Sequence, residues 1–125
     1  MKAATFQGEG EVVVTDVPKS SIKGSGEALV KVTLGAICGS DLHIYHGNVP
    51  INQGAVLGHE FVGVVEEVGA EVQRFKPGDR VVASFFTSCG HCALCRKGWF
   101  NQCVSKGTFG MGANFGGLGL SLIHI

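Results

Sequence analysis

The sequence lacks any long apolar run, and its ten lysine and arginine residues are scattered along the chain. A membrane-spanning helix needs about 20 consecutive apolar residues, and nucleic-acid binding calls for a basic stripe, so neither partner is expected. The start of the chain, Met1 to Gly10, also lacks the apolar core of a secretory signal. We therefore expect a soluble protein of the reducing cytoplasm.

The charge and the length set further limits. The chain has 125 residues and a formal net charge of zero, which suits one domain that buries a core. Neither an internal repeat nor a linker divides it. Glycine is abundant, at 20 of 125 residues, but it follows no fixed period. This distribution predicts many turns between short strands and not a collagen-like repeat.

Short β-type segments separated by turn residues dominate the first two thirds of the chain. Two of them, Lys2–Gln7 and Glu11–Val17, flank a Gly-Glu-Gly turn and predict a hairpin. Three further strands are predicted from alternating or β-branched runs, at residues 28–34, 61–68 and 80–84. Many short strands with glycine turns favour a mainly β barrel or sandwich.

Four of the five cysteines form a cluster with the spacing C-x2-C-x2-C-x7-C: Cys89, Cys92, Cys95 and Cys103. Four thiolates are a common shell of structural zinc, and they leave no coordination position open for chemistry. The cluster therefore predicts a zinc-stabilised lobe over about residues 86–106. Disulfides would need an oxidising compartment, and a redox C-x-x-C motif would need a helix start, which the sequence does not indicate. His91 is a minor alternative to one sulfur.

A second group of potential ligands is more dispersed. Cys38 follows one predicted strand and His59 precedes another, so their side chains can become neighbours and bind zinc. A short helix is predicted between Cys38 and Gly47, with Ser40 and Asp41 as its cap. On spacing alone, a buried free cysteine and a hydrogen-bonded core histidine are the favoured interpretation of the pair.

Four motifs in a fixed order change this interpretation. They are Cys38-Gly39-Ser40-Asp41-Leu42-His43, Gly58-His59-Glu60-Phe61-Val62-Gly63, Gly78-Asp79-Arg80-Val81 and the cysteine cluster. Over about residues 2–118 they resemble the zinc-dependent alcohol dehydrogenases of the medium-chain dehydrogenase/reductase superfamily. The resemblance implies a GroES-like, partly open β-barrel with a short helix after Cys38 and a loop-rich four-cysteine zinc lobe.

The resemblance also implies a second, catalytic zinc. Cys38 and His59 would be its ligands, and Glu60 would lie behind the metal and coordinate it transiently. An alcohol is too weak an acid to ionise at pH 7, but zinc lowers the pKa of a bound oxygen by many units. The alkoxide formed in this way can transfer hydride to NAD or NADP.

Three further residues match positions with roles in the family. Asp41 would hold the imidazole of His59 in the tautomer that binds zinc. Ser40 would contact the substrate oxygen, and His43 would pass the proton of the alcohol to solvent. The substrate implied is a small alcohol or aldehyde, and the implied assembly is a homo-oligomer.

The chain departs from the family pattern at its end. The third protein ligand of the catalytic zinc and the nucleotide-binding Rossmann domain would both lie C-terminal to Ile125, so we assign no cofactor-binding residue. Residues 110–116 begin like a dinucleotide fingerprint, but their spacing is wrong, and we predict a loop. We expect residues 1–118 to be an incomplete catalytic domain and residues 119–125 an atypical tail, truncated or misread, whose His124 is no ligand.

Two other classes of function stay open. A non-enzymatic zinc module would bind a partner through the four-cysteine lobe, but it would have no use for a second metal site at Cys38 and His59. A zinc-free quinone reductase relative would share the barrel without either set of ligands. The residues favour an oxidoreductase whose substrate alcohol and choice of NAD or NADP depend on other segments.

Overall fold

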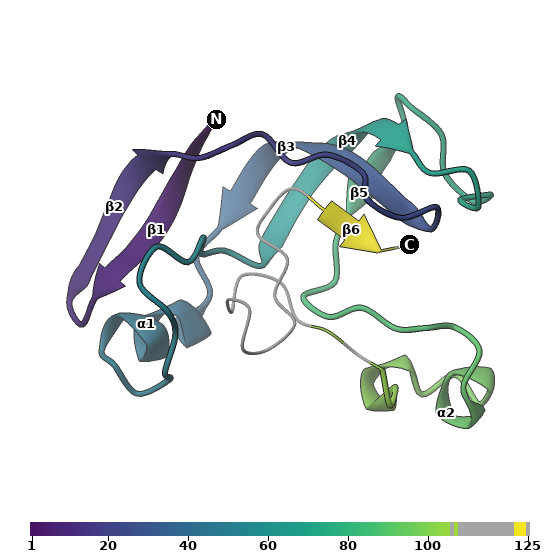
Figure 1. The fold of residues 1–125 in the computed structure, drawn as a ribbon. Coiled ribbons are helices and arrows are strands. Elements are labelled where there is room, and N and C mark those ends of the chain that lie inside the picture. Colours follow the sequence, from purple (N-terminus) through teal and green to yellow (C-terminus); the bar gives the residue numbers. More distant parts are fainter. Residues whose placement is uncertain (106, 108–121, 125) are drawn as a thin grey trace.

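The computed structural model describes residues 1–105, 107 and 122–124. These residues form a two-stranded sheet and a four-stranded sheet with the strand order β5-β4-β3-β6, joined by loops and short helices (Figure 1). The strand pairs are antiparallel. The predicted mainly β fold is therefore confirmed. Within the described part of the chain, none of the helices has the length and apolar character of a membrane span.

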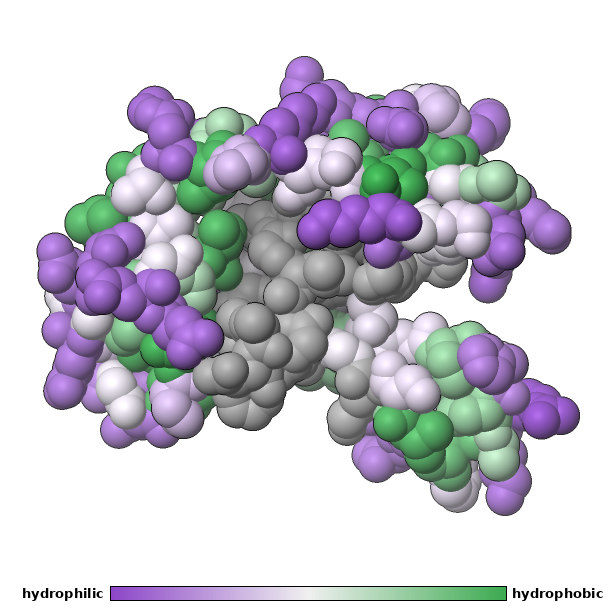
Figure 2. All heavy atoms as spheres, viewed as in Figure 1, coloured by the Kyte–Doolittle hydropathy of each residue, from purple (hydrophilic) through white to green (hydrophobic). Residues whose placement is uncertain are grey.

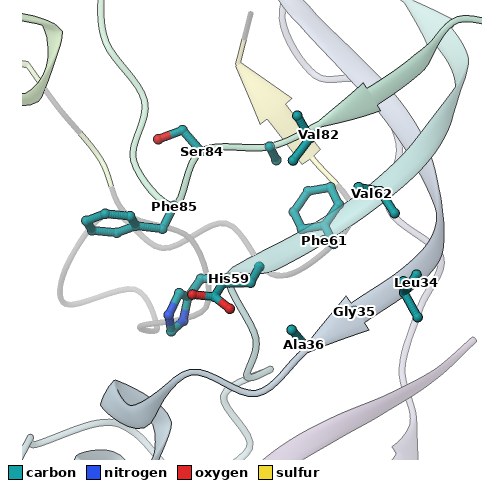
Figure 3. A pocket seen from close by; sticks show the side chains of 11 residues that line it. Leu34, Gly35, Ala36, His59, Phe61, Val62, Val82, Ser84 and Phe85 are labelled. Atoms are coloured by element: carbon teal, nitrogen blue, oxygen red, sulfur yellow. The ribbon is translucent and has the colours of Figure 1, made fainter.

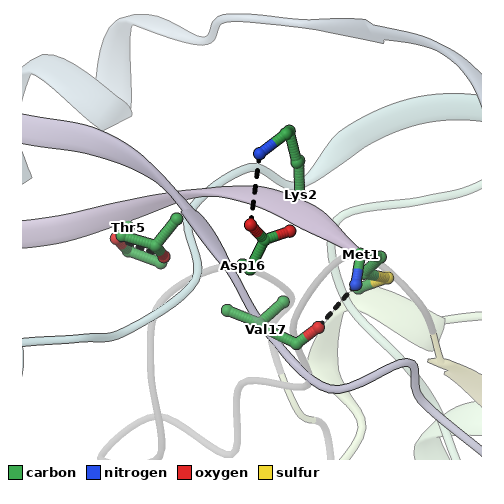
Figure 4. A network of polar contacts seen from close by, with 6 residues as sticks. Met1, Lys2, Thr5, Asp16 and Val17 are labelled. Atoms are coloured by element: carbon green, nitrogen blue, oxygen red, sulfur yellow. Dashed lines mark hydrogen bonds and ion pairs between the residues drawn. The ribbon is translucent and has the colours of Figure 1, made fainter.

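The two-stranded sheet is the hairpin predicted from the sequence. It consists of β1 (Lys2–Gly8) and β2 (Glu11–Asp16). Gly10 in the turn has a φ of 74°, which glycine adopts without the steric cost that a Cβ atom would bring. At the open end of the hairpin, Lys2 Nζ lies 3.2 Å from Asp16 Oδ2 and forms an exposed ion pair between the two strands (Figure 4).

The four-stranded sheet contains β3 (Glu27–Ala36), β4 (Glu60–Val68), β5 (Arg80–Val82) and β6 (Leu122–His124). The first three agree with predicted strands, although β5 is shorter than expected. Strand β6 was not predicted, because three residues are too few to show a period of two. It pairs with the first residues of β3, so this part of the tail continues the sheet. The loop predicted over residues 110–116 lies outside the described residues.

The buried apolar residues form two small clusters. One lies on the four-stranded sheet and consists of Val30, Phe61 and Val65. The other joins the hairpin to the helix and loop that follow β3, and consists of Phe6, Ile44 and Leu57. The second cluster fixes the helix against the hairpin, close to the point where β3 ends.

The alternation predicted along β3 fails near its end. Val30 is buried, but Leu34, which should lie on the same face, is 68% exposed. The pairing of β3 with β4 shifts between Val32 and Leu34, and a bulge of this kind turns the following side chains away from the face they would otherwise share. Strand β3 therefore leaves the core before the chain reaches Cys38.

The helix predicted after Cys38 is α1 (Gly39–Tyr45), but its cap differs from the prediction. Cys38 is the N-cap residue, and its backbone N–H donates to Asp41 Oδ2 at 3.0 Å. Ser40 lies inside the first turn, so it does not cap the helix. Gly47, with a φ of 73°, follows the last turn as predicted.

The four-cysteine lobe projects from the body of the molecule (Figure 2). It contains α2 (Ala93–Arg96) and the 3-10 helix η1 (Phe100–Gln102). Cys92 is the N-cap of α2, so a helix does start at this C-x-x-C motif, contrary to the prediction. Four residues are too few to show helical periodicity in a sequence. The helix is not part of a βαβ unit, since the strands around it are antiparallel.

Candidate functional site

Cys38, His59 and Glu60 come together where β3 ends and β4 begins. The two strands are antiparallel neighbours, and Ala36 pairs with Glu60, so residues just beyond these positions share one edge of the sheet. One potential ligand atom from each of the three residues lies within 4.8 Å of the others. A thiolate, an imidazole and a carboxylate are all ligands that zinc accepts.

Asp41 connects two of these residues. Its Oδ2 accepts the backbone N–H of Cys38, and its Oδ1 lies 3.4 Å from His59 Nδ1. The side chains of Asp41 and His59 are only 14% and 6% exposed, and these two facing atoms have no aligned hydrogen bond within the described structure. A metal ion on the other ring nitrogen, Nε2, would place the proton on Nδ1, opposite the carboxylate. The unsatisfied pair therefore fits a metal-binding histidine.

Ser40 lies on the other side of the imidazole ring. Its Oγ is 3.1 Å from His59 Nε2, the nitrogen that faces away from Asp41. His43 follows three residues later on α1 and is exposed. Residues spaced by three share one side of a helix, so Ser40, beside the buried imidazole, and the exposed His43 lie on the same side of α1.

A cavity of about 470 Å³ opens beside His59 and Glu60 (Figure 3). Apart from these two residues and Ser84, its walls are apolar side chains and glycine, contributed by β3, β4, the end of β5 and the residues that follow it. Phe85 lies at the same end of the cavity as His59, and the two rings meet edge to face with centroids 6.2 Å apart. Sequence reasoning missed Phe85, although an aromatic residue between a predicted strand and the cysteine cluster was a usable signal.

The four cysteines of the lobe also come together. Their sulfur atoms lie within 4.8 Å of one another, and Cys89 Sγ is 3.6 Å from Cys103 Sγ. Bonds of about 2.3 Å to one tetrahedral zinc ion require sulfurs about 3.8 Å apart, so the group fits a single ion. His91 stays exposed, with its Nδ1 2.7 Å from the carbonyl oxygen of Cys89. It is not a member of the sulfur group.

Backbone N–H groups favour the thiolate form of two of these cysteines. The N–H of Cys95, 3.4 Å from Cys92 Sγ, is the main cause that lowers the pKa of Cys92 to about 6. The N–H of Cys89 likewise lowers the pKa of Cys103. Burial raises the pKa of Cys95 to about 12. A cation among the sulfurs would compensate the cost of burying that thiolate.

Comparison with known proteins identifies the family. Residues 24–122 match the family model described as the alcohol dehydrogenase GroES-like domain. The chain belongs to this family. It is 48% identical over 118 residues to the uncharacterized zinc-type alcohol dehydrogenase-like protein AdhB of Bacillus subtilis, with 93% of this chain and 31% of that protein covered.

Solved structures agree with this membership of the GroES-like family. The alcohol dehydrogenase TADH from Thermus sp. ATN1 superposes with a TM-score of 0.90 and 42% identity, over 98% of this chain and 39% of that one. A putative zinc-binding dehydrogenase from Sinorhizobium meliloti 1021, solved with NADP bound, gives 0.72 and 36%, over 89% and 32%. The predicted zinc-type alcohol dehydrogenase family and GroES-like fold are confirmed, and the chain spans between 31% and 39% of the length of these three proteins.

Proposed function

We propose that these residues form the zinc-binding part of an oxidoreductase that transfers hydride between an alcohol or aldehyde and NAD or NADP. The observation that carries the proposal is the meeting of Cys38, His59 and Glu60 beside the unsatisfied Asp41–His59 pair. Because the chain spans about a third of its relatives, we assign nicotinamide binding to a longer polypeptide, in which residues 1–118 form part of the catalytic domain.

Two zinc ions have different tasks in this proposal. Cys38 and His59, with Glu60 as an additional ligand, would hold a catalytic zinc that acts as a Lewis acid and makes an alcohol oxygen more acidic. Asp41 would keep the imidazole in the ligating tautomer and orientation. The four cysteines would hold a structural zinc, since a shell of four thiolates leaves no position for a substrate.

Ser40 and His43 provide the route for the proton. The Ser40 hydroxyl already forms a hydrogen bond at His59 Nε2, so it lies within reach of a substrate oxygen at the same place. In our proposal Ser40 accepts the proton of the alcohol while its own proton passes to His43. The exposed imidazole of His43 then releases the proton to water.

The cavity beside His59 supplies a place for the carbon skeleton of the substrate. Its walls are largely apolar, and apolar surroundings strengthen the electrostatic effect of a nearby cation. The NADP in the Sinorhizobium meliloti structure supports a nicotinamide cofactor for the longer protein. The present residues do not favour one alcohol over another.

The test is an assay of a longer polypeptide that carries these 125 residues. With zinc, NAD or NADP and a panel of alcohols, we expect reduction of the cofactor that His59→Ala abolishes. Ser40→Ala should lower kcat by about 10²–10⁴-fold, because it removes a proton-transfer group and no metal ligand. Ser21→Ala, an exposed serine of the connector before β3, is the matched control and should leave kcat unchanged. Zinc-dependent turnover that persists in His59→Ala would contradict the proposal.

The 125-residue chain by itself is expected to show no turnover. Fixing both reactants contributes roughly 7–11 kcal/mol to lowering a bimolecular barrier, and we assign the group that would fix the nicotinamide to the longer polypeptide. The check is the same absorbance assay with the zinc-loaded chain. Sustained reduction of NAD or NADP that disappears in His59→Ala would show that these residues assemble a cofactor site of their own.

A further inference from the structure

Two hydrogen bonds close the neck of the four-cysteine lobe. The backbone N–H of Thr87 donates to the carbonyl oxygen of Gly107 at 3.0 Å, and the N–H of Gly107 donates to Thr87 Oγ at 3.0 Å. All four cysteines lie between these two residues in the sequence. The segments that enter and leave the lobe are therefore hydrogen-bonded to each other through Thr87 and Gly107. The Thr87 hydroxyl accepts one of these two hydrogen bonds.

The residues just before Thr87 lead from this neck to the candidate catalytic site. Phe86 packs edge to face on Phe85 with ring centroids 4.3 Å apart, and Phe85 packs in the same way on His59 at 6.2 Å. Both distances lie in or near the range that favours such aromatic pairs. Phe85 is 48% exposed, so the protein core holds its ring only in part. The neck anchors the backbone two residues later, at Thr87.

We propose that Thr87 is a positioning residue that couples the two metal centres. With the neck closed, Thr87 holds Phe85 against the imidazole of His59. This contact restricts the imidazole to the orientation in which one of its nitrogens lies within 4.8 Å of ligand atoms of Cys38 and Glu60. The imidazole then loses less conformational freedom when a metal ion binds, so the affinity of this centre for the metal is higher. This inference rests on the proposed function, because it takes Cys38 and His59 as metal ligands.

The coupling has a second, reciprocal consequence. If a filled lobe strengthens metal binding at Cys38 and His59 by some factor, metal at that centre must strengthen binding in the lobe by the same factor. The two affinities can be measured separately, which gives two independent values of one quantity. Neither measurement requires a substrate, a nicotinamide or turnover.

The test uses cobalt(II) as a spectroscopic probe of the chain whose lobe has been filled with zinc. Cobalt affinity at Cys38 and His59 is measured by absorbance for the wild type, Thr87→Val and Thr87→Ser. Valine keeps the shape of threonine but removes the hydroxyl, so we expect its affinity to fall about 2–10-fold, the range of one aromatic contact. Serine restores the hydroxyl and should match the wild type. Equal affinities for the wild type and Thr87→Val would overturn the inference.

A double-mutant cycle separates positioning from general loss of stability. Phe85→Leu removes the ring that transmits the effect, so adding Thr87→Val to it should not lower the cobalt affinity further. The same loss in both backgrounds would overturn the inference. Should Thr87→Val fail to keep zinc in the lobe, Cys92→Ser takes its place as the change that empties the lobe. We then expect Cys92→Ser to lower the cobalt affinity at Cys38 and His59, and we expect no further loss when it is added to Phe85→Leu. The same loss in both backgrounds would again overturn the inference. Cobalt binding that Cys38→Ala does not weaken would reject the proposed function itself, whereas normal binding without an effect of Thr87 rejects only the coupling.

Discussion

At the scale of single residues, the motif glycine Gly63 shows how the strands before and after the site are held together. A Cβ atom at Gly63 would lie 2.5 Å from Val30 Cγ1 and 2.6 Å from the carbonyl oxygen of Lys31. Strands β3 and β4 can approach this closely only because the side chain is a hydrogen atom. The motif thus contains a packing residue as well as candidate ligands.

Gly63→Ala is expected to lower the free energy of unfolding by about 1–3 kcal/mol, because the added methyl group forces the two strands apart. Gly8→Ala is the matched control, since Gly8 also lies in a strand and a Cβ atom there meets nothing within 4 Å. Urea unfolding monitored by circular dichroism measures both. Equal losses in the two variants would mean that the close approach of β3 and β4 does not limit position 63.

The sequence predicts the four-cysteine group from spacing alone, but it predicts Cys38 and His59 as a ligand pair only through the order of the motifs. Spacing left Cys38 and His59 as an ambiguous cysteine and histidine, because neither residue type is specific for metal binding. Their closeness depends on the antiparallel register of β3 and β4, which is a long-range property. The contact of Phe85 with His59 is equally non-local, and no local pattern encodes it.

At the scale of elements, α1 is fixed by a single buried side chain. Ile44 is fully buried and packs with Phe6 and Leu57, which attach the helix to the hairpin. The same helix carries Ser40 and Asp41, whose side chains contact His59 on its two sides. The orientation of the candidate site therefore depends on an apolar contact outside it.

Ile44→Ala is expected to cost about 2–5 kcal/mol of stability, and metal affinity at Cys38 and His59 should fall with it. Leu42→Ala on the same helix is the control, because Leu42 is 53% exposed and its truncation should change stability by about 0.5 kcal/mol or less. Thermal unfolding and metal titration give the two readouts. A similar effect of both substitutions would show that the buried contact does not hold α1.

Elements with a strong local signal were predicted well, and those without one were not. The hairpin and β4 have β-branched residues and turn glycines over several positions, and both were found. The end of β3 was misjudged because a bulge depends on the partner strand and not on the sequence of β3 itself. Strand β6 and helix α2 were missed because three or four residues carry no measurable period.

At the scale of the whole molecule, the described chain combines two small apolar clusters with a lobe in which four sulfur atoms lie together. The lobe contributes Cys95 and Cys103 as its buried side chains, whereas Trp99 and Phe100 remain 55% and 51% exposed. In our proposal, zinc binding supplies much of the local folding free energy of the lobe.

We propose that the chain holds two zinc ions of unlike character, one with an open coordination position and one enclosed by four thiolates. The most direct test follows zinc release from the fully loaded chain during a chelator titration. We expect two separate phases, because Cys38 and His59 are only two firm ligands, whereas the lobe offers four. The weaker phase should vanish in His59→Ala and the stronger one in Cys92→Ser. A single phase, or a weak phase that survives in His59→Ala, would contradict the account.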